Sequence, residues 1–162
     1  MFVRRIVTLC SVSLVALGLI ATPAAADDCF PYYRAVNGKY SHSYEKWGYG
    51  PGWRAQAYGP GVLKLNRTVE TSNSFNSVAG ITVNGVSSAV GFDVTRSESH
   101  SAEFEAPVPD RGPWILELGT VEEVFVFDIQ QHDGCAGIAL RITGQSTAER
   151  SGNVIFRYYR AP

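Results

Sequence analysis

The sequence predicts an all-β fold, either an antiparallel sandwich or an elongated twisted sheet with one long Ser/Thr-rich β-hairpin. Two apolar-alternating arms flank Asn84-Gly85, a dipeptide typical of two-residue hairpin turns. Short runs rich in β-branched and aromatic residues follow, separated by Gly, Asp and Ser. After residue 26 no apolar repeat of 3.6 residues, which would indicate a helix, extends over a useful length. We expect a single domain of ordinary size over residues 27–162.

The predicted hairpin covers residues 62–109. If Val83 pairs with Val86 across the turn, the odd-numbered residues of the first arm and the even-numbered residues of the second share one apolar face. Register and apolar pattern therefore agree, which favours this pairing over a one-residue slip. The pairs expected in this register are Leu63 with Ala106, Leu65 with Phe104, Phe75 with Val94, Ala79 with Val90, and Ile81 with Ser88.

The segments on either side of the hairpin differ in composition. Residues 27–61 are aromatic and rich in Gly and Pro, which favours short strands and turns. Residues 110–162 contain four runs that predict short strands. These runs are Trp114–Leu118, Val124–Ile129, Gly137–Ile142 and Val154–Tyr159.

The first 26 residues have the pattern of a signal peptide. Arg4 and Arg5 precede the apolar run Ile6–Ala21, and a small-residue Ala24-Ala25-Ala26 site follows. We expect cleavage after Ala26 and secretion to the extracellular space. The adjacent arginines leave export by the general or the twin-arginine route open. The run is short for a membrane-spanning helix.

Charge excludes one class of partner. Without Arg4 and Arg5 the chain keeps 12 Lys and Arg against 15 Asp and Glu, and no basic stripe is present. We therefore expect no nucleic-acid partner. A cell-surface glycan or a membrane remains open as partner, and we expect a monomer in solution.

Cysteines and histidines set the expected chemistry. Cys29 and Cys135 are the two cysteines after residue 26, and in an exported chain the default is one disulfide, with a reactive thiol pair as the alternative. His42, His100 and His132 have no metal-ligand spacing, and no G-x-S-x-G motif is present. We expect no enzyme, no metal and no cofactor, because the sequence offers no nucleophile-base pair.

Glu122 and Glu123 are adjacent in a predicted strand. Side chains of neighbouring strand residues point to opposite faces, so these two carboxylates cannot act together on one substrate.

Two further features suggest binding. Nine aromatic residues fall between Phe30 and Tyr58, and Trp47, Tyr49 and Trp53, flanked by glycines, are the candidates for stacking on a ligand. The middle of the hairpin carries 12 Ser and Thr in residues 67–101. Polar residues there, which include Arg67, Thr71 and Arg96, occupy positions that belong to the apolar face of the predicted hairpin. One interpretation is a bend at this polar waist, allowed by Gly80 and Gly91, with the tip packed on a second sheet.

The other interpretation is a resemblance. Ser/Thr-rich alternating arms, an apolar tip and Ala106-Pro107-Val108-Pro109 before a new strand resemble the stem region of aerolysin-type β-pore-forming toxins. The resemblance covers about Val62 to Ile129 and implies a hairpin that rearranges into a membrane barrel. The tip residues that it implies as membrane-contacting are Val78, Ile81, Val83, Val86, Val90 and Phe92. The run Ser88–Thr95 is also similar to small uncharacterised secreted bacterial β proteins, a resemblance that implies no activity.

The cysteine pattern makes one prediction. A disulfide between Cys29 and Cys135 closes a loop of about 106 residues, for which the chain-entropy model gives about 4 to 5 kcal/mol of stabilisation. Thiol titration of the chain from Asp27 onward, under denaturing and non-reducing conditions, is expected to detect no free thiol. Two free thiols per chain would contradict the disulfide.

Overall fold

The structure of the chain, a computed structural model, describes residues 29–48 and 52–162. The predicted signal peptide, its cleavage site and Tyr49 lie outside the described residues. The described chain is mostly strand, and all strand pairs are antiparallel, which confirms the all-β prediction.

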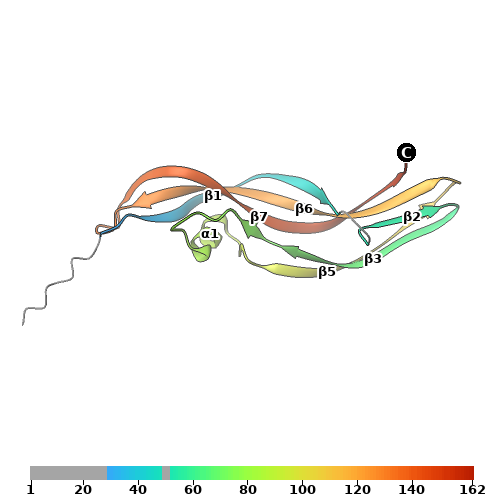
Figure 1. The fold of residues 1–162 in the computed structure, drawn as a ribbon, viewed down its shortest axis with the longest axis horizontal. Coiled ribbons are helices and arrows are strands. Elements are labelled where there is room, and N and C mark those ends of the chain that lie inside the picture. The colour runs from blue at the N-terminus through green and yellow to red at the C-terminus, as the bar shows by residue number, and fades with distance from the viewer. Residues whose placement is uncertain (1–28, 49–51) are drawn as a thin grey trace, which may run out of the picture.

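One long sheet runs the length of the elongated molecule (Figure 1). Its strand order is β1-β6-β7-β4, and β2 continues the edge of β6 that β1 occupies. The bounds are β1 Tyr32–Trp47, β2 Arg54–Tyr58, β4 Ser74–Phe75, β6 Pro113–His132 and β7 Ala139–Arg160.

The long strands correct the prediction of short ones. The four runs expected between residues 110 and 162 belong to only two strands, β6 and β7, and β1 extends over 16 residues. The β6–β7 register shifts between Thr120 and Glu122 and again between Ile129 and Gln130. Residues that were expected to end a strand are therefore accommodated as bulges within a continuous ladder.

The second layer is a two-stranded ribbon of β3 (Gly61–Ser72) and β5 (Ser97–Val108). Its ladder runs without a shift from the pair Gly61–Val108 to the pair Ser72–Ser97. Leu63 faces Ala106 and Leu65 faces Phe104, which confirms the predicted register over this part of the hairpin.

The predicted turn at Asn84-Gly85 is wrong, because these residues lie in a helix, α1 (Val83–Val90). Thr82 caps its N-terminus by accepting a hydrogen bond from the Gly85 N–H at 3.1 Å. Gly91 ends the helix with φ 82°, a left-handed conformation that glycine adopts without strain. The strand pairs expected beyond residue 72 do not form, and Phe75 pairs instead with Ala148 of β7.

The segment between β3 and β5 is packed against the long sheet, as the interpretation of a bend at the waist expected. Val86 and Val90, one helical turn apart, are buried against Phe127 of β6. The other predicted tip residues are half-buried at Val78, Ile81 and Phe92 and exposed at Val83.

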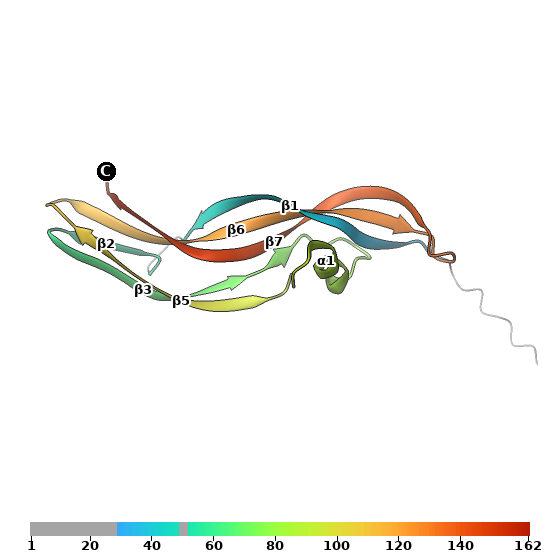
Figure 2. The same cartoon turned by 180° about the vertical axis from the view of Figure 1, so that it is seen from behind.

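Two separate apolar cores follow from this arrangement. The first lies between the β3–β5 ribbon and one half of the long sheet. The second lies between α1 and the other half, at the end that carries the disulfide (Figures 1 and 2). The first core comprises Leu63, Leu65, Val69, Ala102, Val108, Leu116 and Leu118; the second comprises Val86, Val90, Val94, Phe127 and Ala148.

The long sheet turns over between the two cores. Leu116 and Leu118 of β6 face the ribbon, whereas Phe127 of the same strand faces α1. Even- and odd-numbered residues of a strand point to opposite faces. The ribbon and α1 nevertheless lie on the same side of the sheet (Figures 1 and 2), because this narrow sheet twists strongly along its length.

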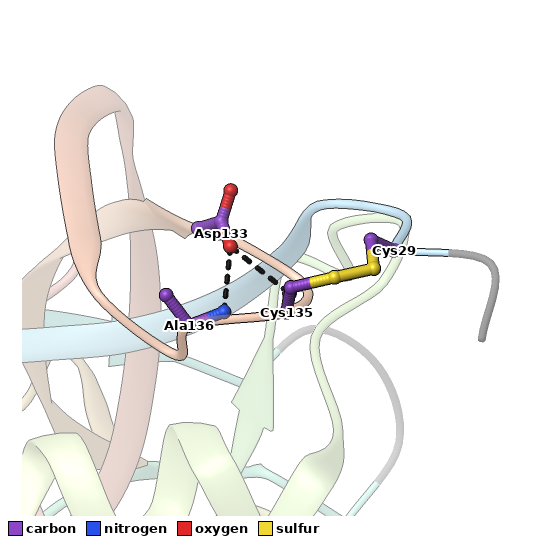
Figure 3. Close-up of a disulfide and its surroundings, with 4 residues drawn as sticks. All are labelled: Cys29, Asp133, Cys135 and Ala136. Carbon is purple, nitrogen blue, oxygen red and sulfur yellow. Dashed lines mark hydrogen bonds between the residues drawn. A yellow bond between two sulfur atoms is a disulfide. The ribbon is translucent and has the colours of Figure 1, made fainter. Parts of the chain in front are cut away.

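A disulfide between Cys29 and Cys135 joins the start of the described chain to the β6–β7 turn, with their Cα atoms 5.0 Å apart. The Asp133 carboxylate accepts hydrogen bonds from the N–H groups of Cys135 and Ala136 at 2.9 and 2.7 Å (Figure 3). The predicted disulfide is confirmed.

Among the described residues, no helix is long and apolar enough to cross a bilayer.

The second core supplies a stability prediction. Phe127 is fully buried, so Phe127→Ala removes its burial and leaves a cavity. We expect a loss of about 3–5 kcal/mol in the free energy of unfolding, measured by urea denaturation. Tyr58→Ala, at a side chain that is 75% exposed, is the control and should have a much smaller effect. Equal losses in the two variants would contradict the assignment of Phe127 to a core.

Candidate functional site

Polar side chains fill the region between the two cores. We call this region the waist and define it by Thr71 of β3, Asn73, Thr120 and Glu122 of β6, and Ser151 of β7. Thr71, Thr120 and Glu122 are buried. Asn73 joins the ribbon to the long sheet, because its Oδ1 accepts a hydrogen bond from the Ser151 N–H at 3.0 Å. The polar stretch predicted in the hairpin therefore packs against an equally polar stretch of β6 and β7.

Glu122 is the central group of the waist, with only 5% of its surface exposed. The Thr120 hydroxyl donates to its Oε1 at 2.9 Å, and the Ser151 hydroxyl donates to its Oε2 at 2.7 Å. Among the ion pairs of the described residues, none involves this carboxylate. A buried charge is costly unless hydrogen bonds or a counter-charge compensate it, and here two neutral hydroxyls do so.

A cavity of about 370 Å³ lies beside Glu122. Two of the predicted stacking residues, Trp47 and Trp53, form part of its wall. Trp53 packs directly on residue 48, and only glycine fits there: a Cβ would lie 2.0 Å from Cδ2 of Trp53. The remaining lining includes Lys46, Glu70, Thr71, Ser72, Thr120 and Ser151.

Trp47 and Trp53 are both half-buried. The Trp47 indole covers Gly119, its ladder partner, and so lies on the sheet face opposite Thr120 and Glu122, whereas Trp53 lies on their side. The guanidinium of Arg157 lies 4.3 Å from the Trp47 ring centroid, and that of Arg67 lies 5.5 Å from the Trp53 ring centroid. Trp53 also packs against the first core. Such cation–π contacts hold each ring in a fixed orientation.

Tyr44 extends the acidic character of this region along β1. It pairs with Glu122 across the ladder, and its hydroxyl donates to Glu149 at 3.4 Å. Burial raises the pKa of the Tyr44 phenol, and the negative charges of Glu149 and Glu122 raise it further. The phenol therefore remains a neutral hydrogen-bond donor beside two carboxylates.

A second cavity, of about 260 Å³, shares Thr71 and Ser151 with the first. Its cationic lining residues already have partners. Arg96 pairs with Glu98 at 2.5 Å, and Nε of Arg150 donates to Glu123 at 2.7 Å. The cations of this cavity are thus paired with carboxylates, whereas the carboxylate of Glu122 in the first cavity has hydroxyl partners and no ion pair among the described residues.

Glu122 and Glu123 have different partners, as expected for neighbours in a strand. Sequence reasoning considered Glu122 only as a pair with Glu123, and so missed it as a site residue in its own right. Thr120, two positions earlier and on the same face, was the available signal. The second hydroxyl comes from Ser151, 29 residues further along the chain.

The histidines lie apart in the described structure. His100 faces Val69 in the ribbon and lies 3.4 Å from Glu98. His132 is buried near the disulfide, where its ring stacks on Tyr32, and His42 contacts Ser41. In residues 29–48 and 52–162, no group of three or more His, Cys, Asp and Glu could hold a metal ion.

Glu117 marks a second buried carboxylate, away from the cavity. Arg54 and Arg157 each contact it at 2.5 Å, and Arg54 also donates to the Tyr159 hydroxyl at 3.0 Å. Unlike Glu122, this carboxylate is fully paired with cations from β2 and β7.

Comparison of the chain with protein-family models, with curated proteins and with solved structures finds no match. The functional interpretation therefore rests on the geometry of the described residues.

Glu117 generates a pH prediction. Burial raises the pKa of its carboxyl, but hydrogen bonds from Arg157, Tyr159 and Arg54 outweigh burial and hold the pKa below its ordinary value. A lowered pKa stabilises the fold above the unfolded-state value of about 4.3, and this contribution is lost as the pH falls through the folded-state pKa. We expect the free energy of unfolding to fall more steeply below about pH 4.3 in the native chain than in Glu117→Gln.

Urea unfolding at a series of pH values measures this difference. Glu103→Gln, at an exposed position of β5, serves as the control and should follow the native curve. Parallel curves for the native chain and Glu117→Gln would contradict the prediction.

Proposed function

We propose that the chain is a secreted, non-catalytic β module that binds a cell-wall or cell-surface glycan in the waist cavity. The observation that carries the proposal is that Trp53 and the buried carboxylate of Glu122 line one cavity.

The chemistry of the cavity suits a sugar. A pyranose ring has an apolar C–H face that packs on an aromatic ring, and hydroxyls around its edge that need hydrogen-bond partners. The Trp53 indole offers the first kind of contact. The carboxylates of Glu70 and Glu122 accept hydrogen bonds from sugar hydroxyls, and the Thr71 hydroxyl both donates and accepts. Ligand pockets typically measure about 300–1,000 Å³, and this cavity lies within that range.

The environments of the two cavity carboxylates favour binding of the glycan without its hydrolysis. Thr120 and Ser151 already occupy both oxygens of Glu122, and Glu70 lies exposed on β3. Glycoside hydrolysis needs one carboxyl to supply a proton while the second acts from the opposite side of the bond. Release of reducing ends from a bound oligosaccharide would contradict the non-catalytic part of the proposal.

A second candidate function, membrane insertion of the hairpin, has one observation in its favour. The strands of the β3–β5 ribbon pair with each other and, among the described residues, with no strand of the long sheet. Side chains hold the two layers together, as in the stacking of Phe104 on Phe156 at 4.8 Å. This packing is compatible with a ribbon that detaches.

Liposome leakage separates the two functions. A membrane-inserting ribbon releases dye, and the double variant Phe104→Cys/Phe156→Cys, once oxidised, prevents this release until a reductant is added. A glycan-binding module leaves leakage at background. We expect background leakage, because Arg67, Arg96 and Glu98 lie at positions that belong to the apolar face of the predicted hairpin, and charges on the lipid-facing side of a strand are costly.

Intrinsic fluorescence tests glycan binding. The chain has three tryptophans, and Trp114 lies apart from the cavity, stacked on Tyr158 at 4.7 Å. We expect soluble cell-wall oligosaccharides to change the emission of the native chain and of Trp114→Phe, but not that of Trp47→Phe/Trp53→Phe. Trp53→Ala should weaken binding by about three- to tenfold, as expected for loss of roughly 0.5–1.5 kcal/mol from one aromatic contact.

Circular dichroism of each variant provides the folding control. A response that persists in the double variant would place the ligand elsewhere on the molecule.

A further inference from the structure

Glu122 distinguishes this cavity from a neutral sugar site. Each of its oxygens accepts one hydrogen bond, from Thr120 at 2.9 Å and from Ser151 at 2.7 Å. An ionised carboxylate has about four lone-pair sites, so two hydroxyl donors leave acceptor capacity on a group that lines the cavity.

The cavity lining contains one further carboxylate and one lysine besides Glu122. Glu70 is a second carboxylate of the cavity lining, and the charge of Glu122 is one cause of the raised pKa of Tyr44. Lys46 is the cation at the cavity, and it projects from β1 opposite Thr120. Its ammonium forms no ion pair with Glu122, and its side chain is exposed.

We infer that the cavity selects a glycan that carries a free primary amine, with the ammonium group bound to Glu122. The inference rests on the proposed function and names the class of sugar. An ammonium group donates three hydrogen bonds and supplies the counter-charge that a buried carboxylate needs.

A neutral or N-acetylated sugar meets only part of this requirement. Its hydroxyls can donate to Glu122, but they leave the buried charge without a counter-charge. Acetylation of an amine removes both its charge and its ion-pairing ability. The cavity therefore discriminates between the two sugars by the charge on the amine, which acetylation removes.

The test compares two soluble probes, a tetramer of glucosamine and a tetramer of N-acetylglucosamine, by calorimetry on the full mature chain. We expect the glucosamine tetramer to bind at least about tenfold more tightly, a ratio typical of a hydrogen bond to a charged group. Glu122→Gln keeps the shape of the side chain and should remove this preference while weak binding of the N-acetylated tetramer remains. Added salt should weaken binding of the glucosamine tetramer more than binding of the N-acetylglucosamine tetramer.

Two variants serve as controls. Glu123→Gln changes the adjacent carboxylate, which pairs with Arg150 and does not line the cavity, and should keep the preference. Lys46→Gln removes a positive charge that repels the ammonium group of the ligand. This variant should therefore bind the glucosamine tetramer a few-fold more tightly. Lys46→Gln also keeps the inference testable if Glu122→Gln does not fold.

The outcomes separate this inference from the proposed function. Equal binding of the two tetramers, unchanged in Glu122→Gln, overturns the amine preference and leaves a glycan-binding module. Binding of methylammonium as tight as that of the glucosamine tetramer overturns the sugar and supports a site for the cation alone. Absence of binding by either tetramer, together with a response to neutral oligosaccharides in the fluorescence test, overturns only the amine inference. Absence of binding to every glycan overturns both.

Discussion

The whole structure depends on the pairing of β6 along both of its edges. β1 and β2 occupy one edge and β7 the other over nearly the full length of the strand. Its side chains Leu116 and Leu118 form the centre of one core, and Phe127 forms the centre of the other. The ribbon and α1 therefore pack on one shared support. The waist lies where β6 passes from one core to the next, and there Thr120 and Glu122 replace apolar residues.

The hairpin illustrates which parts of the fold are predictable. Its register over Gly61–Ser72 and Ser97–Val108 is fixed by face parity, since a one-residue slip would expose Leu63 and Leu65. The prediction of the hairpin tip was wrong because Asn84-Gly85 was interpreted as a turn, although Thr82 and Gly91 on either side are residues typical of helix caps. Thr82, Val86 and Val90 at helical spacing, and Gly91, together specify one short helix.

The candidate site was predictable only in part. Trp47 and Trp53, flanked by glycines, were predicted to stack on a ligand, and both residues line one cavity, although both side chains are half-buried. The role of Glu122 depends on Ser151, which reaches it through the pairing of β6 with β7. Local sequence contains no information on that pairing. Long-range partners of this kind decide whether a buried carboxylate is neutralised, as at Glu117, or left available to a ligand.

The disulfide has a mechanical consequence. Without it, tension on the chain at residue 29 would peel β1 from β6 one hydrogen-bond pair at a time, starting at Tyr32 and His132. The covalent link to Cys135 diverts that tension into the turn between β6 and β7, past the free end of the ladder. Pulling then loads the two central strands together, along their length, so that many pairs must yield at once. A tether attached at this end would thus meet the stiffest direction of the molecule.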